Sequence, residues 1–131
     1  MIFGAGTDII EIDRVERAVS DAAFCAKIFT VSERDYLAPG ADHAVSRAKA
    51  RSAAGLFAAK EACAKALGTG FRGFRPTDVE ILHDGLGRPE VRLHNRAAEI
   101  AAENSVIKIH VSISHCETYA VAYAVAEVCE K

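Results

Sequence analysis

The sequence predicts an α+β fold in which a small antiparallel sheet packs on a long central helix. Apolar residues recur at helical spacing through residues 43–67, whereas residues 106–114 alternate between apolar and polar side chains. The 131 residues contain no repeat, low-complexity segment or linker, so we expect one domain spanning residues 1–131. A chain of this length builds only a modest core, which oligomerisation would supplement.

The N-terminal part is expected to hold a strand and two helices. Residues 2–9 suit a short strand that its two glycines interrupt. Apolar residues at helical spacing predict a helix from Glu11 to about Phe24. A capping-box pattern at residues 30–33 (TVSE) then starts a short helix, which a Pro-Gly pair closes at residues 39–40.

The middle of the chain predicts the long helix and two short strands. The helix runs from His43 to Leu67, and Gly68 follows as its stop. Short apolar runs predict strands at Val79–Leu82 and Glu90–Leu93. Between them, residues 84–89 (DGLGRP) have the composition of a turn.

The C-terminal part predicts a helix followed by a hairpin. Asn95 is expected to cap a helix that runs to about Asn104. Residues Val106–Ser114 alternate cleanly and suit a strand, whereas the alanines of Tyr119–Val128 suit either a strand or a helix. We expect residues 106–128 to form an antiparallel hairpin. Its first strand has four apolar residues on one face: Ile107, Ile109, Val111 and Ile113.

Composition excludes several classes of protein. A formal net charge of −2 gives no global electrostatic case for binding nucleic acid or a membrane surface. The four cysteines include no CxxC pair and lack the spacing of a zinc site. The first residues, MIFGAGTDII, lack the basic start of an export signal, and no apolar run approaches the length of a membrane span. We therefore expect a soluble, cytoplasmic protein with reduced thiols.

The long helix contains charges in an apolar setting. Lys60, Glu61 and Lys65 interrupt a helix that is otherwise apolar nearly all round, and buried charges need partners. Glu61 and Lys65 stand at i,i+4, and the small Ala54 and Ala58 beside them leave room for a ligand. This pattern suits a carboxylate that holds Mg²⁺ and a lysine that holds phosphate. An ordinary solvent-facing ion pair remains the alternative, and Lys60 is expected to extend its amine into solvent.

The N-terminal glycines precede a second candidate ligand. Asp8 would lie near the end of the first strand, where a carboxylate is a plausible second Mg²⁺ ligand. The alternative role for Asp8 is a helix N-cap. Gly4 and Gly6 do not begin a dinucleotide-binding fingerprint, because Ile9 occupies the place of the third glycine.

Two further segments suit phosphate or nucleotide binding. On a strand, His110, Ser112 and Ser114 point to one side, either toward a nucleotide or toward solvent. The Gly-Thr-Gly at residues 68–70 is either a plain helix cap or a loop that lets a ligand approach the backbone. No Ser/His/Asp or Cys/His set can be assembled from the spacing, so nucleophilic catalysis is not expected.

Four segments in order resemble the holo-acyl-carrier-protein synthases, the short type of 4′-phosphopantetheinyl transferase. They span nearly the whole chain and are residues 6–15 (GTDIIEIDRV), 57–70 (FAAKEACAKALGTG), 84–89 (DGLGRP) and 110–115 (HVSISH). The resemblance implies the 4′-phosphopantetheinyl transferase fold. It also implies transfer of the 4′-phosphopantetheine group from coenzyme A to a serine of apo-acyl carrier protein, which releases adenosine 3′,5′-bisphosphate.

The resemblance also implies roles for individual residues. Asp8 and Glu61 would bind Mg²⁺, and Lys65 would contact phosphate and assist proton transfer. The residues that would line the coenzyme A site are Lys65, Gly68, Thr69, Gly70, Pro89, His110 and Ser112. Arg14 and Arg17 would meet the acidic helical surface of the carrier protein. Family members are homotrimers with active sites between subunits.

Two positions depart from the family pattern. Leu56 stands where the family usually has an arginine, so a phosphate contact is either lost or supplied by another residue such as Arg47 or Arg51. Asp21 interrupts the basic run expected to face the carrier protein. Two other functions remain open at this stage. One is a coenzyme-A-binding trimer without activity, and the other is a small trimeric isomerase that needs no metal.

Overall fold

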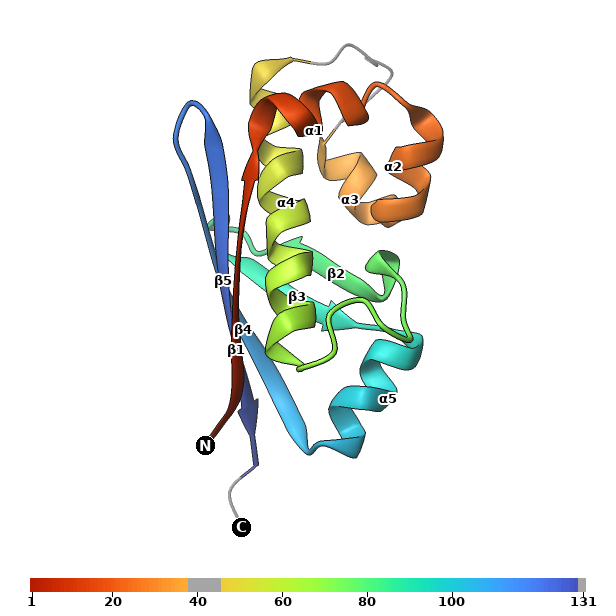
Figure 1. Cartoon of the computed structure of the whole chain (residues 1–131), viewed down its shortest axis with the longest axis vertical. Helices are drawn as coiled ribbons and strands as arrows, with labels where there is room; N and C mark the ends of the chain where they lie inside the picture. The colour runs from red at the N-terminus through yellow and green to blue at the C-terminus, as the bar shows by residue number, and fades with distance from the viewer. Residues whose placement is uncertain (38–45, 130–131) are drawn as a thin grey trace.

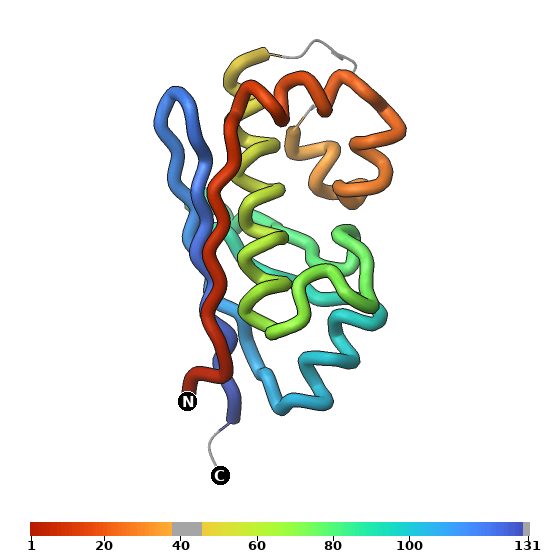
Figure 2. The backbone as a smooth tube through the Cα atoms, viewed as in Figure 1, coloured from red at the N-terminus to blue at the C-terminus, as the bar shows by residue number. Residues whose placement is uncertain are grey.

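The computed structural model describes residues 1–37 and 46–129 and confirms the α+β class. Three long strands form an antiparallel sheet in the order β1-β5-β4, with β1 at Ile2–Glu11, β4 at Val106–His115 and β5 at Tyr119–Val128. Helix α4, Arg47–Ala66, lies along one face of this sheet (Figure 1). The first and last strands run side by side, as the tube in Figure 2 shows.

Small residues let α4 approach the sheet closely. On α4, Ala54, Ala58, Ala62 and Ala66 are buried, and so are Ala120, Ala122, Ala124 and Ala126 of β5. A Cβ atom on Gly4 or Gly6 would overlap the carbonyl oxygen of Ala66 or Ala62, respectively. The sequence suggested that the two glycines interrupt the strand. In the structure the strand continues from Ile2 to Glu11, and the glycines make room for the helix. The room expected outside Ala54 and Ala58 is likewise filled, because both side chains are completely buried.

The first predicted helix is broken into two. Helix α1 spans Ile12–Ala18 and α2 spans Ala22–Ile28. The break occurs because the Asp21 carboxylate accepts a hydrogen bond from the Ala23 amide at 2.9 Å and caps α2. A single helix from Glu11 to Phe24 was therefore wrong.

The capping box at residues 30–33 is confirmed and starts α3, Val31–Leu37. The Thr30 amide donates to Glu33 Oε1 at 2.8 Å, and the Glu33 amide donates to Thr30 Oγ1 at 3.2 Å. The predicted stop at residues 39–40 and the first residues of the predicted long helix, 43–45, lie outside the described residues. Ser46 caps α4 through the Lys49 amide.

A second, two-stranded sheet lies beside the first. The two predicted strands are confirmed as β2, Val79–His83, and β3, Pro89–Leu93, which pair antiparallel, and each extends one residue further than expected. The turn between them is held by the Asp84 carboxylate, which accepts the amides of Leu86 and Arg88. A short 3₁₀ helix, η1, precedes β2 at Pro76–Asp78.

Helix α5, Asn95–Glu103, begins one residue earlier than expected. Its N-cap is His94, whereas Asn95 has a φ of 50° and donates from Nδ2 to Asp78 Oδ1 at 3.0 Å. The Asn95 side chain is thus engaged by Asp78 rather than by its own helix.

The predicted hairpin is confirmed, since β4 and β5 pair antiparallel and residues 119–128 form a strand. One side chain departs from the predicted alternation. A register shift between Val106 and Lys108 turns Ile107 outward, where it is 63% exposed. Ile109, Val111 and Ile113 face the core as expected.

Candidate functional site

Asp8, Glu61 and Lys65 meet where β1 crosses the C-terminal half of α4. Asp8 shares the helix-facing side of β1 with Gly6, and a Cβ atom on Gly6 would come within 2.8 Å of the Lys65 Cβ atom. The Lys65 ammonium lies 3.3 Å from Asp8 Oδ1 and donates to the Thr7 carbonyl oxygen at 2.9 Å. Lys65 therefore pairs with the strand, and not with Glu61 along the helix as the i,i+4 spacing had suggested.

The Glu61 carboxyl group lies in an environment that disfavours its charged form. Partial burial raises its pKa first, the negative charge of Asp8 raises it further, and Lys65 opposes both effects. Within residues 1–37 and 46–129, its carboxylate makes no hydrogen bond or ion pair. The carboxylates of Asp8 and Glu61 repel each other, and the Lys65 ammonium lies beside them. A divalent cation bound to the two carboxylates would remove this repulsion. No group of three or more His, Cys, Asp or Glu in the described part of the chain is arranged to hold a metal.

The prediction that Lys60 extends its amine into solvent was wrong. Its side chain is only 1% exposed, and its ammonium forms an ion pair with Glu33 Oε1 at 2.6 Å. It also donates to the carbonyl oxygens of Pro76 at 3.0 Å and Val79 at 2.6 Å. These three acceptors match the three N–H donors of an ammonium, which is why the charge is tolerated in the core.

Pro89 and His110 line one pocket, of about 360 Å³, between the facing edges of β3 and β4. Arg88 and Lys108 add positive charge to this pocket, and Glu90 is its acidic lining residue. His110 Nε2 lies 2.8 Å from Glu127 Oε1, and this hydrogen bond lowers the pKa of Glu127.

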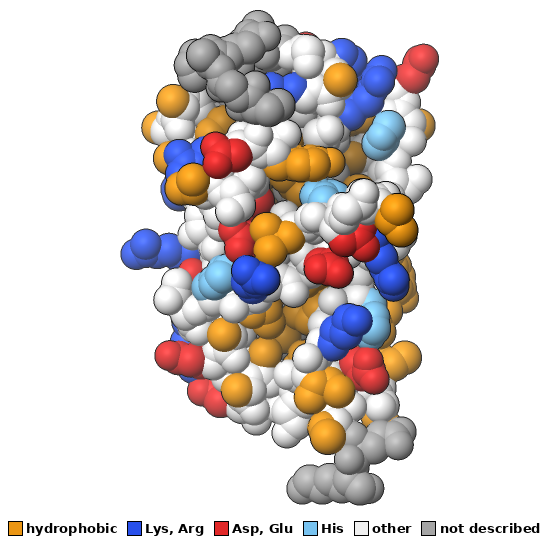
Figure 3. Space-filling view, turned by 180° about the vertical axis from the view of Figure 1, so that it is seen from behind, with side chains coloured by type: hydrophobic (Ala, Val, Ile, Leu, Met, Phe, Trp, Pro, Cys, Tyr) orange, Lys and Arg blue, Asp and Glu red, His pale blue; other side chains and the backbone are white. Residues whose placement is uncertain are grey.

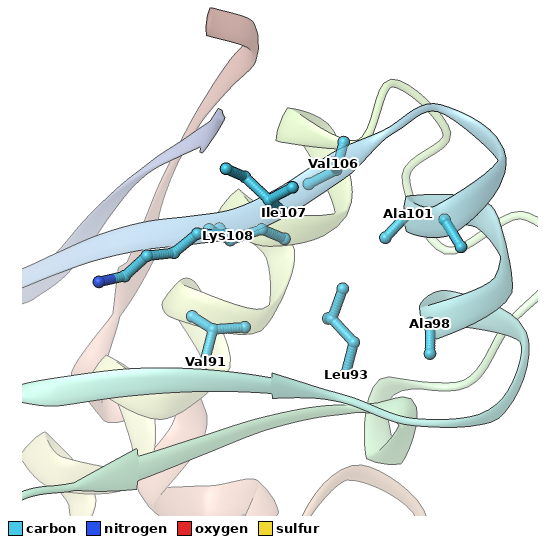
Figure 4. A pocket seen from close by; sticks show the side chains of 9 residues that line it. Val91, Leu93, Ala98, Ala101, Val106, Ile107 and Lys108 are labelled. Atoms are coloured by element: carbon cyan, nitrogen blue, oxygen red, sulfur yellow. The ribbon is translucent and has the colours of Figure 1, made fainter. Parts of the chain in front are cut away.

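An apolar pocket of about 250 Å³ adjoins the first one. Its wall comes from β3, α5 and β4, and Lys108 lies at its edge (Figure 4). The space-filling view in Figure 3 shows hydrophobic side chains gathered in a hollow on the rear face of the molecule, with charged side chains around it. The two pockets share Val91, Ile107, Lys108 and Ile109 as lining residues.

The predicted row of donors lies on the outer face of the large sheet. His110, Ser112 and Ser114 alternate with the core-facing residues of β4 and are exposed. Asp8 points to the opposite face, because it pairs directly with the buried Ala122. Within one chain, therefore, the structure does not bring His110 and Ser112 together with Asp8 and Glu61.

The loop after α4 is confirmed as a helix cap. Gly68 and Gly70 have φ values of 85° and 58°, and their amides donate to the carbonyl oxygens of Lys65 and Ala64. A Cβ atom on either glycine would contact nothing within 4 Å, so backbone conformation rather than crowding favours glycine. The Thr69 hydroxyl donates to the Gly70 carbonyl oxygen at 2.8 Å.

Leu56 occupies a position where the family usually has an arginine, and the structure distinguishes the two candidates for replacing it, Arg47 and Arg51. Arg47 is occupied, since it bonds Asp13, Glu16 and the Glu117 carbonyl oxygen. Arg51 makes no ion pair within the described residues. It lines a pocket of about 260 Å³ together with Tyr36, Ser52, Gly55, Leu56, His83, Gly87, Pro89, Ile113 and His115. None of these lining residues is acidic, so the pocket suits an anion.

Arg14 and Arg17 are exposed on α1 at i,i+3, so their side chains share one side of that helix. No helix among the described residues has the length and apolar character to cross a membrane.

The chain matches known proteins over nearly all its length. A model of the 4′-phosphopantetheinyl transferase superfamily matches residues 4–124. A holo-[acyl-carrier-protein] synthase of Clostridium perfringens is 47% identical, over 97% of this chain and 95% of that protein.

Solved structures agree with this similarity. The holo-[acyl-carrier-protein] synthase of Neisseria meningitidis is similar with a TM-score of 0.84 and 34% identity, over 97% of this chain and 99% of that chain. The enzyme of Bacillus anthracis, solved in complex with coenzyme A (3′,5′-ADP), gives a TM-score of 0.80 at 35% identity, over 98% of this chain and 99% of that chain.

Proposed function

This chain belongs to the 4′-phosphopantetheinyl transferase superfamily, among the holo-acyl-carrier-protein synthases, and on that premise we propose how its residues perform the reaction. The enzyme transfers 4′-phosphopantetheine from coenzyme A to a serine of apo-acyl carrier protein. The observation that carries the proposed mechanism is the convergence of Asp8, Glu61 and Lys65 from two elements far apart in the chain.

Asp8 and Glu61 are proposed to hold a magnesium ion. They fit it because Mg²⁺ sites in proteins combine one or two carboxylates with substrate phosphate and water. The raised pKa of Glu61 supports this assignment, because the repulsion from Asp8 that contributes to it would vanish beside a cation. When bound, the ion would neutralise and orient the pyrophosphate of coenzyme A.

Lys65 is proposed to bind the phosphate that is transferred. In the free protein its ammonium is bonded to Asp8 and to the Thr7 carbonyl oxygen, and its side chain is half exposed. It can therefore turn from Asp8 toward a phosphate oxygen without leaving a buried charge behind. There it would stabilise charge on the leaving 3′,5′-ADP, and a proton held at Nζ would be available to that oxygen.

The nucleotide end of coenzyme A is proposed to bind along the basic pocket of Pro89 and His110. Arg88 and Lys108 would attract its phosphates, and Arg51 in the neighbouring anion pocket would take the place of the arginine missing at Leu56. Ser112 would contribute its hydroxyl from the same face as His110. Gly68, Thr69 and Gly70 would let the pyrophosphate approach the backbone beside Lys65.

A homotrimer is proposed because the two halves of this site lie on opposite faces of one sheet. A neighbouring copy that presents its His110 face to the Asp8 side of the first chain would complete the site, and repetition of this contact closes a ring. The outer face of the sheet has apolar residues suited to such burial. They are Ile9, Tyr119, Val121 and Tyr123, all exposed in the single chain.

Arg14 and Arg17 are proposed to receive the acidic surface of the carrier protein, since both are exposed on one side of α1. Lys27 is exposed on α2 and would add to them, whereas Asp21 is occupied in capping α2. The cytoplasmic location and the single domain over residues 1–131 stay predictions from the sequence.

The decisive experiment is intact-mass spectrometry of an apo-carrier protein incubated with coenzyme A, Mg²⁺ and this enzyme. We expect the carrier to gain the mass of the phosphopantetheine group and expect EDTA to prevent the gain. Excess Mg²⁺ should restore it. Full transfer in EDTA would contradict the metal assignment, and binding of coenzyme A without any transfer would favour an inactive binding protein.

A further inference from the structure

The face of α4 that meets the large sheet has few side chains to determine how the helix is rotated. Against β1 and β5 it consists of alanines packed on the alanines of β5 and the glycines of β1, and beside β4 its Gly55 approaches the Ile113 side chain. Large side chains that interlock give a packed core its unique arrangement, and the part of this interface formed with β1 and β5 has few of them. Close approach is therefore ensured, whereas the rotation of α4 about its axis needs another determinant.

The opposite face of α4 supplies directional bonds. Lys60 is inserted there and bonds three acceptors on α3, η1 and β2, namely Glu33 Oε1, the Pro76 carbonyl oxygen and the Val79 carbonyl oxygen. The Lys60 ammonium also lies 6.0 Å from the centre of the fully buried Phe29 ring. All of these bonds would lengthen or bend if the helix turned.

Glu33 is held as firmly as Lys60. Its Oε1 atom also accepts the Thr30 amide at 2.8 Å, and its Oε2 atom accepts the Ile81 amide at 2.8 Å. The carboxylate is therefore fixed by the start of α3 and by β2, with a side chain that is fully buried. A buried ion pair with complete hydrogen bonding favours one geometry over its neighbours, even where it contributes little net stability.

We propose that Lys60 and Glu33 form a positioning pair, which sets the rotation of α4 and thereby holds Glu61 and Lys65 opposite Asp8. The inference rests on the proposed function of those three residues. Lys60 precedes Glu61 by one residue, so any rotation at Lys60 is transmitted directly to Glu61. At a helix radius of about 5–6 Å, a turn of roughly ten degrees moves a side chain by about 1 Å.

Such a displacement is enough to affect catalysis. A misplacement of about 1 Å in a catalytic constellation can cost about 100-fold in rate. A role confined to stability predicts something different. Replacing a buried ion pair with uncharged side chains of similar volume often leaves stability unchanged or raises it, so catalysis by the folded enzyme would be unaffected.

The test is the double variant Lys60→Met/Glu33→Gln, which removes both charges and retains an amide oxygen for one backbone N–H. Lys49→Met, on the same helix and outside the pair, is the matched control. The first readout is the contact between Lys65 on α4 and Gly6 on β1, followed by NMR nuclear Overhauser effects in metal-free protein. The second is kcat and KM for coenzyme A in the transfer assay, with circular dichroism to establish that the variants are folded.

We expect the folded double variant to show a weakened Overhauser contact between Lys65 and Gly6 and a kcat lowered about 10- to 100-fold, with a smaller change in KM. The control should match the parent protein in both readouts. A folded double variant with the parent Lys65–Gly6 contact and the parent kcat would overturn the proposal. If the double variant does not fold, Glu33→Asp applies the same test, because it keeps both charges and shortens one arm by a methylene.

The two readouts separate this inference from the proposed function. The Lys65–Gly6 contact is measured without metal, so it reports the rotation of α4 even if transfer does not use Asp8 and Glu61 as magnesium ligands. Transfer by the parent protein in EDTA would remove the magnesium assignment, and the NMR contact would still decide whether Lys60 and Glu33 position α4.

Discussion

Lys65 on α4 lies 3.3 Å from the Asp8 carboxylate on β1 and donates a hydrogen bond to the carbonyl oxygen of Thr7 at 2.9 Å. The ammonium therefore partly compensates Asp8, while Glu61 keeps a carboxylate without a bonded partner in the described residues. The two carboxylates and one ammonium together carry one uncompensated negative charge. The Lys65 side chain is half exposed to solvent. An anionic substrate that arrives with a divalent cation would satisfy all three groups.

Glu61→Gln is expected to abolish transfer and to stabilise the free protein. Because folding raises the pKa of Glu61 above 4.5, ionisation of this group opposes folding. The favourable contribution of Glu61 to the free energy of unfolding is present below its ordinary pKa. It is lost as the pH rises through the raised pKa of the folded protein. Glutamine stays neutral, so the variant should gain a few tenths of a kcal/mol at neutral pH, because solvent screens a partly exposed carboxylate, and little in acid.

Urea unfolding at neutral pH and below pH 4.5 measures this difference, and the mass-spectrometric assay measures transfer. We expect turnover to fall by at least about 100-fold, the scale of losing one charge-stabilising group in an active site. Near-normal turnover of Glu61→Gln would remove Glu61 from the mechanism.

Lys65→Met is expected to lower kcat by about 100-fold, because the phosphate that is transferred loses its ammonium partner. Binding of Mg²⁺ should not weaken, since Asp8 no longer shares its carboxylate with a cation of the protein. Titration with Mg²⁺ in the transfer assay measures both quantities, and Lys49→Met serves as the control. An unchanged kcat would show that the Lys65–Asp8 bond is purely structural.

Mixed trimers are expected to recover activity from two inactive parents. Asp8→Asn disables one side of the sheet and His110→Ala the other, so a site formed by two subunits can take an intact half from each. Random mixing in a ring would make about one quarter of the interfaces competent. The matched control is a mixture of Asp8→Asn with Glu61→Gln, which should recover nothing because both changes disable the same half. Equal recovery in both mixtures, or in neither, would contradict the shared site.

Gly6→Ala is expected to destabilise the protein by roughly 2–3 kcal/mol or more, because the added Cβ would collide with the backbone of α4 at Ala62. Gly85→Ala is the matched control, since a Cβ there meets nothing within 4 Å and the residue has no strained φ. It should change stability little or raise it slightly. The free energies of unfolding in urea compare the two, and equal losses would contradict the close helix–strand contact.

Much of the local structure was predictable from the sequence because it depends on neighbouring residues. The capping box at residues 30–33, the strand at residues 79–82 and the alternation around His110 all follow from side chains a few positions apart. Errors arose where a local signal was ambiguous. Asp21 could equally sit inside a helix or cap one, and in the structure it caps α2.

The candidate site was predictable as a set of residues and only partly as an arrangement. Resemblance of the motifs to a known family singled out Asp8, Glu61 and Lys65, and the structure brings Lys65 to Asp8. The i,i+4 spacing of Glu61 and Lys65 pointed to the wrong partner, because a lysine can reach a strand as easily as the next helical turn. Nothing in the local pattern indicated that Glu33 would lie beside Lys60.

By itself, the sequence determined the fold class, most of the helices and strands and the family of the protein, since these follow from periodicity and from short motifs. Only the tertiary structure decided that Lys60 is buried on Glu33 and that Asp8 and His110 lie on opposite faces of one sheet. Those outcomes depend on which distant segments pack together. Burial and charge pairing between such segments are properties of the packed chain and have no signature within a few residues of sequence.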